Sequence, residues 1–117
     1  MSENYIDVLG ETELALNTGH TTIVNGWPIM ICRTEAGVSA VINRCTHAES
    51  TLQGGRVRRG TVSCPLHGAR FDLATGKCVG APYRPLKTFP VRIANGRIEI
   101  DVPTEEPGYE YLPMQTG

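Results

Sequence analysis

Apolar and polar residues alternate along much of the chain, and this period of two predicts β-strands. The clearest stretch lies near the C-terminus, where apolar residues occupy every second position on both sides of Asn95-Gly96. They are Phe89, Val91 and Ile93 before this dipeptide, and Ile98, Ile100 and Val102 after it. Because Asn-Gly readily adopts the positive φ angles of a tight two-residue turn, the pattern predicts a β-hairpin.

Other segments extend this all-β pattern. The apolar runs 27–32 and 38–42 flank Glu35-Ala36-Gly37, which predicts a second hairpin. The segment from Gly10 to Asn17 fits one helical turn after a strand, and no long amphipathic helix is indicated. From about residue 103 to 117 the chain is rich in Pro, Gly and Glu, which predicts a flexible acidic tail. The fold class expected from these patterns is all-β.

Length and composition indicate one folded domain over residues 1–117. The hydrophobic fraction of 40%, the charged fraction of 20% and a mean hydropathy of -0.17 are ordinary for globular proteins. The first residues have acidic side chains and no apolar run behind them, so no secretory signal is indicated. No apolar stretch approaches the roughly 20 residues of a membrane span. We therefore expect a cytoplasmic protein, in which the four cysteines favour metal binding or burial over disulfides.

Charge is unevenly distributed, although the net charge is only -1. Residues 1–32 and 101–117 contain acidic residues and no Lys or Arg, whereas eight of the eleven basic residues lie between positions 44 and 87. These eight are Arg44, Arg56, Arg58, Arg59, Arg70, Lys77, Arg84 and Lys87. Only Glu49 and Asp72 oppose them in that interval. The middle of the chain is basic and both ends are acidic.

The same basic interval contains two pairs of potential metal ligands. Cys45-Thr46-His47 is followed, after sixteen residues, by Cys64-Pro65-Leu66-His67-Gly68. Pro65 restricts the backbone and Gly68 permits a tight turn, so both suit a loop at a metal centre. Two thiolates and two imidazoles satisfy tetrahedral zinc, but common structural zinc sites begin with a Cys pair and end with a His pair. Divided between two irons, the same ligands suit a Rieske centre.

The run from Cys45 through Asp72, followed by Thr75-Gly76-Lys77 and Ala81-Pro82, resembles the Rieske ferredoxins of bacterial ring-hydroxylating (aromatic) dioxygenase systems. The resemblance is strong over about residues 43–87. It implies one [2Fe–2S] cluster whose inner iron is bound by Cys45 and Cys64 and whose outer iron is bound by His47 and His67. It also implies an antiparallel β-sandwich base with a smaller inserted cluster-binding subdomain over about 43–86.

The function implied by this resemblance is transfer of single electrons without an enzymatic reaction. An NAD(P)H-dependent flavin reductase would supply the electron, and a terminal oxygenase of aromatic compound degradation would receive it. The oxygenase needs a second iron, usually held by two His and one carboxylate, and only His20 remains here for that purpose. No Gly-x-Gly-x-x-Gly motif for a nicotinamide cofactor is present.

The sequence also gives an expectation about partners and leaves two alternative functions open. The basic cluster-bearing end is expected to meet acidic patches of the two redox partners transiently, with no nucleic acid or membrane bound and the chain monomeric. One alternative is a Rieske-type small subunit of a reductase such as nitrite reductase. The other alternative is a zinc-binding interaction module. Cys32 and Cys78 are interpreted as structural, and His20 as a surface strand residue.

The reduction potential is expected to be low. High-potential Rieske proteins have an additional disulfide at positions matching Ser50 and Leu66, and hydroxyl groups at positions matching Ala69 and Phe71. Hydrogen bonds to cluster and ligand sulfurs stabilise the more negative reduced state, so their loss lowers the potential. We therefore expect roughly −150 mV, the low end of the Rieske range.

Overall fold

The computed structural model describes residues 5–45, 51–52, 54–65, 68–108 and 111–112. Within these residues the chain forms β-strands and one short 3-10 turn. In chain order they are β1 (Tyr5–Gly10), η1 (Glu11–Glu13), β2 (Thr18–Val24), β3 (Trp27–Thr34), β4 (Gly37–Ile42), β5 (Val57–Arg58), β6 (Thr61–Ser63), β7 (Arg70–Asp72), β8 (Cys78–Val79), β9 (Thr88–Phe89), β10 (Val91–Ala94) and β11 (Arg97–Asp101). The predicted all-β fold and the single helical turn are confirmed. No helix in the described part of the chain is long and apolar enough to cross a membrane.

The C-terminal hairpin belongs to a three-stranded antiparallel sheet with the order β1-β11-β10. Asn95 and Gly96 form its turn with φ angles of 53° and 74°, which confirms the prediction made from this dipeptide. Because β11 is the central strand, Ile98 and Ile100 are fully buried. Ile93 lies on the edge strand β10 and is 45% exposed, although it pairs directly with Ile98.

The second predicted hairpin, β3 with β4, lies in a four-stranded sheet with the order β2-β3-β4-β9. Strand β3 is central in this sheet, and its side chains from Trp27 to Cys32 are all buried. A strand buried on both faces has a continuous apolar run instead of an alternating one. That is the run that the sequence contains at 27–32.

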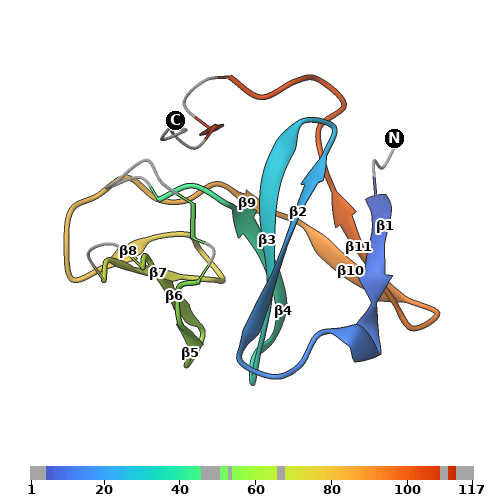
Figure 1. The fold of residues 1–117 in the computed structure, drawn as a ribbon, viewed down its shortest axis with the longest axis horizontal. Helices are drawn as coiled ribbons and strands as arrows, with labels where there is room; N and C mark the ends of the chain where they lie inside the picture. Colours follow the sequence, from blue (N-terminus) through green and yellow to red (C-terminus); the bar gives the residue numbers. More distant parts are fainter. Residues whose placement is uncertain (1–4, 46–50, 53, 66–67, 109–110, 113–117) are drawn as a thin grey trace.

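A third sheet, β5-β6-β7-β8, lies to one side of the other two (Figure 1). The chain leaves the second sheet after β4 and returns to pair with β4 as β9, through Ala40 with Phe89 and Val41 with Thr88. All strands of the third sheet lie between these two points. Val62 and Phe71 of the third sheet join the same apolar core as residues of the first two sheets.

The segment after β11 passes the turn that joins β2 and β3, as the orange-red trace at the top of Figure 1 shows. The indole Nε1 of Trp27 donates a hydrogen bond to the Glu105 carbonyl oxygen at 2.9 Å. The guanidinium of Arg44 donates to the Leu112 carbonyl oxygen, also at 2.9 Å. Nothing in the sequence pattern predicted these contacts, because a segment rich in Pro, Gly and Glu has no hydrophobic period.

Candidate metal centre

Cys45 follows the end of β4 and is fully buried. The backbone before it is fixed by Asn43, whose N–H donates to the Pro28 carbonyl oxygen at 2.9 Å. The side-chain Oδ1 of Asn43 accepts the Leu52 N–H at 2.7 Å, so Asn43 also joins the two ends of the loop that begins at Cys45. Both Asn43 and Arg44 are buried polar residues, and such residues persist in a core when their hydrogen bonds are satisfied. The first cysteine therefore has a fixed position.

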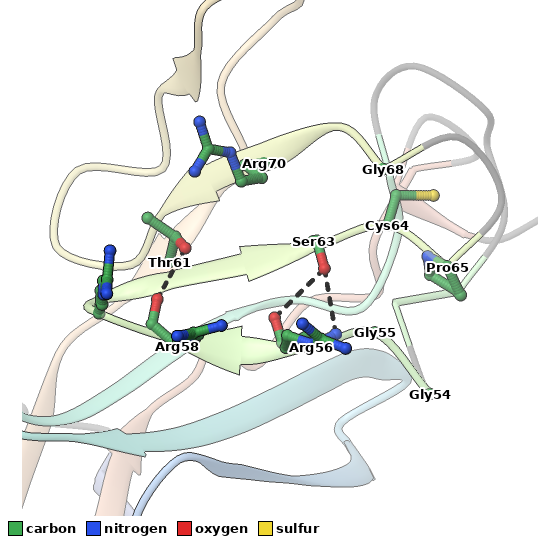
Figure 2. Close-up of a pocket in the computed structure, with 11 residues that line it drawn as sticks. Gly54, Gly55, Arg56, Arg58, Thr61, Ser63, Cys64, Pro65, Gly68 and Arg70 are labelled. Atoms are coloured by element: carbon green, nitrogen blue, oxygen red, sulfur yellow. Dashed lines mark hydrogen bonds between the residues drawn. The ribbon is translucent and has the colours of Figure 1, made fainter.

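Cys64 follows the end of β6 and is 1% exposed. Its N–H donates to the Ala69 carbonyl oxygen at 2.7 Å, and its carbonyl oxygen accepts the Gly68 N–H at 2.9 Å. Gly68 has a φ of 74°, which favours glycine, so the tight turn predicted at this residue is confirmed. In Figure 2 the Cys64 sulfur points beyond the end of β6.

A backbone contact that the sequence did not predict joins the two cysteine loops. Gly55 donates its N–H to the Leu52 carbonyl oxygen at 2.9 Å, which closes the end of the first loop. A Cβ atom on Gly55 would overlap the carbonyl oxygen of Ser63, the residue before Cys64. The Ser63 N–H in turn donates to the Arg56 carbonyl oxygen at 2.9 Å. Only glycine at position 55 lets the first loop touch the strand that leads into the second.

A second glycine, Gly76, lies in close contact with the segment that leads back to β9. Gly76 has a φ of 81°, and its carbonyl oxygen accepts the Leu86 N–H at 2.7 Å. A Cβ atom there would overlap the Leu86 carbonyl oxygen. The motif Thr75-Gly76-Lys77 is visible in the sequence, but its contact with Leu86 was not predicted.

The other two predicted ligands, His47 and His67, lie outside the described residues. The described cysteines fit a cluster by their chemistry, because two buried thiols stand at the start of two loops that hydrogen bonds and Gly55 hold together. Thiolates are the ligands that hold iron–sulfur clusters. The ligand set of Cys45, His47, Cys64 and His67 remains a prediction.

The remaining titratable candidates lie in ordinary structural positions. Cys32 is fully buried in the middle of β3, and Cys78 is half-buried on β8. None of the four cysteines forms a disulfide. His20 is exposed on β2, which confirms its interpretation as a surface strand residue.

The thiol of Cys32 is expected to resist alkylation in the folded protein. Burial raises its pKa from 9.0 to about 12, and only the thiolate is nucleophilic. Iodoacetamide at pH 8 should therefore modify half-buried Cys78 and leave Cys32 unmodified, as measured by peptide mass spectrometry. The same shift makes the unfolding free energy fall as pH rises from about 9 to about 12, because only the unfolded chain ionises this thiol there. Rapid modification of Cys32 at pH 8 would contradict its burial.

Comparison with known proteins gives the family. The Rieske [2Fe–2S] domain family matches residues 4–90. The ferredoxin component of a naphthalene 1,2-dioxygenase system of Pseudomonas aeruginosa is 32% identical over 103 residues, which cover 87% of this chain and 99% of that protein. The chain belongs to the Rieske [2Fe–2S] domain family.

Solved structures agree with this membership. The ferredoxin of carbazole 1,9a-dioxygenase from Nocardioides aromaticivorans has a TM-score of 0.76 and 29% identity, covering 83% of this chain and 96% of that one. A ferredoxin of Sphingomonas yanoikuyae has a TM-score of 0.77 and 26% identity, covering 86% of this chain and all of that one. The cofactor of this Rieske domain is one [2Fe–2S] cluster, so the zinc-binding alternative is not supported.

Proposed function

We propose that this Rieske protein is the ferredoxin component of an aromatic-ring dioxygenase system. It would accept single electrons from an NAD(P)H-dependent flavin reductase and pass them to a terminal Rieske non-haem iron oxygenase. The observation that carries this proposal is the alignment with a ferredoxin component over 99% of that relative's length. Because that relative is a ferredoxin component, the role proposed for this chain is electron transfer without an enzymatic reaction.

The ligand loops give this function a physical basis. When bound, the cluster supplies a one-electron couple, and imidazole ligands in place of two thiolates raise its potential relative to an all-cysteine cluster. Cys45 and Cys64 would hold the inner iron from fully buried positions that exclude water. We propose His47 and His67 as the ligands of the outer iron, and residues 43–86 as the cluster-binding subdomain. We also propose a cytoplasmic location, because that compartment keeps thiols reduced and able to bind a cluster.

The decisive experiment is spectroscopic. The purified protein should be brown, and after dithionite reduction its low-temperature EPR spectrum should show the low average g-value of a cluster with mixed His and Cys ligands. A colourless protein with stoichiometric zinc would overturn the proposal. The nitrite reductase alternative is tested by purification from the native cell, because a fixed small subunit co-purifies with its large subunit, whereas a monomeric ferredoxin with transient partners elutes alone.

Introducing a hydroxyl beside the cluster loops is expected to raise the potential. Phe71 is fully buried on β7, and the resemblance to high-potential Rieske proteins aligns it with a tyrosine. A hydrogen bond of about 1 kcal/mol to a ligand sulfur would shift a one-electron couple by about 40 mV, so Phe71→Tyr should raise the potential by roughly that amount. Phe71→Leu serves as the control without a hydroxyl. Dye-mediated redox titration measures both variants, and an unchanged or lower potential in Phe71→Tyr alone would contradict the alignment.

A further inference from the structure

The third sheet has two chemically different faces. On one face Val57, Val62 and Phe71 are buried in the core. The register pairs Arg58 with Thr61 and Ser63 with Arg70, which places these residues on the opposite, outer face. Arg56 precedes Val57 and belongs to the same outer face, since side chains alternate along a strand. Pairing of the short strands β5, β6 and β7 therefore brings arginines from both sides of β6 onto one surface.

These arginines line a groove of about 750 Å³ that ends at the second cluster loop (Figure 2). Arg56, Arg58 and Arg59 come from the β5–β6 hairpin and Arg70 from the neighbouring strand. Cys64, Pro65 and Gly68 line the end of the groove at the second cysteine loop. No acidic residue lines the groove within the described part of the chain. Asp72, two residues after Arg70, lies opposite Thr61 on the same outer face, but its Oδ1 accepts the N–H groups of Ala74 and Thr75.

Several other basic residues of the chain have internal partners. Arg44 binds the Leu112 carbonyl oxygen, and the Nζ of Lys87 lies 5.5 Å from the ring centroid of Trp27. Outside the basic interval, Arg92 pairs with Glu99 and Arg97 with Asp7. The four groove arginines are exposed, and among the described residues no carboxylate pairs with their guanidinium groups. Their charge is available to a partner molecule.

Arg59 occupies a position that does not favour arginine. It and Gly60 are the two turn residues of the β5–β6 hairpin, with φ angles of 52° and 75°. A turn with positive φ at both residues favours Asn, Asp or Gly at the first position. An arginine in this conformation is disfavoured in the fold, and backbone outliers of this kind are often found at functional sites.

From these observations we infer that the arginine groove is the docking site for a carboxylate-rich surface segment of the redox partner. The inference rests on the proposed function and specifies which surface the partner uses. Guanidinium groups bind carboxylates with well-directed hydrogen bonds, and a partner seated in the groove contacts Pro65, the residue after a cluster ligand. Docking there brings the partner's redox centre close to the cluster and makes encounter sensitive to salt.

The test uses the cluster-loaded protein and an acetylated hexaglutamate peptide, with binding measured by isothermal titration calorimetry at 20 mM NaCl. The variants are Arg58→Gln, Arg59→Asn, Arg70→Gln and the triple combination. Arg97→Gln is the matched control, because it removes one positive charge on β11 in a different sheet. Arg59→Asn also suits the turn better than arginine, so its melting temperature should not fall.

We expect each single groove variant to weaken peptide binding about two- to fivefold, the triple variant to abolish it, and the control to leave it unchanged. Inorganic phosphate should bind the wild type more weakly than the peptide does. No peptide binding by the wild type, equal binding by the triple variant, or tighter binding of phosphate would each overturn the inference. The visible spectrum of every variant should match the wild type, so loss of docking and failure of the cluster assignment are told apart.

Discussion

Replacing Cys64 with serine is expected to abolish cluster binding. Cys64 is 1% exposed, and its backbone N–H and carbonyl oxygen are held by hydrogen bonds to Ala69 and Gly68, which fixes the position from which its thiol would bind iron. A serine hydroxyl stays protonated at neutral pH and is a poor ligand for iron. Since metal binding is coupled to folding, fewer than roughly one in ten purified molecules should retain a cluster, as measured by visible absorbance and iron content.

Cys78→Ser is the matched control for this prediction. It removes a thiol from the same sheet, on a strand that pairs with Phe71 next to the second ligand loop, but at a half-buried position. Its iron content and spectrum should equal those of the wild type. Full iron content in Cys64→Ser, or complete loss in Cys78→Ser, would show that the two thiols have been assigned the wrong roles. Cys45→Ser should behave as Cys64→Ser does.

A Gly55→Ala substitution is expected to lower the unfolding free energy by about 3 kcal/mol or more. The added methyl group would overlap the Ser63 carbonyl oxygen, and the Leu52 carbonyl oxygen would lie only 2.9 Å from the same methyl group. Relief of this overlap requires the first cysteine loop to separate from β6. Urea denaturation followed by circular dichroism measures the loss, and the cluster should bleach at a lower urea concentration than in the wild type.

The neighbouring Gly54→Ala substitution separates this steric effect from backbone conformation. Gly54 has a φ of 87°, yet no atom of the described residues lies within 4 Å of the position that an added methyl group would take. Alanine there should cost only the roughly 1–2 kcal/mol of a left-handed conformation. If both variants lost equal stability, the close approach of Gly55 to Ser63 would not be the cause.

Local sequence information was sufficient to predict the two hairpins. Alternation and Asn95-Gly96 predicted β10 and β11 because turn geometry depends only on adjacent residues. Alternation did not distinguish Ile93 from Ile98, which pair directly but differ greatly in exposure. That difference arises because β11 has a neighbour on each side and β10 lies at an edge of its sheet. Strand order is a long-range property, and the pattern within one strand does not encode it.

The cluster motif could likewise be predicted from the sequence, because metal ligands are particular residue types at short spacings. The sequence predicted Cys45 and Cys64 as ligands and Gly68 as a turn residue. It did not predict Gly55 as the contact between the two loops. Position 55 requires glycine because the Ser63 carbonyl oxygen occupies the space that a side chain would take. The sequence does not show which backbone atom of another segment will lie against a given glycine.

The distribution of charge shows most clearly which properties follow from the sequence and which depend on the tertiary structure. The sequence by itself determined that eight basic residues occupy the middle of the chain, and hence that the region around the ligands is electropositive. Only the tertiary structure decided that Arg44 and Lys87 have internal partners while Arg58 and Arg70 share an open groove. Net charge is a sum over residues and follows from composition. The electrostatic field at the surface that a partner contacts depends on which side chains of each strand face solvent. Strand pairing determines which side chains these are.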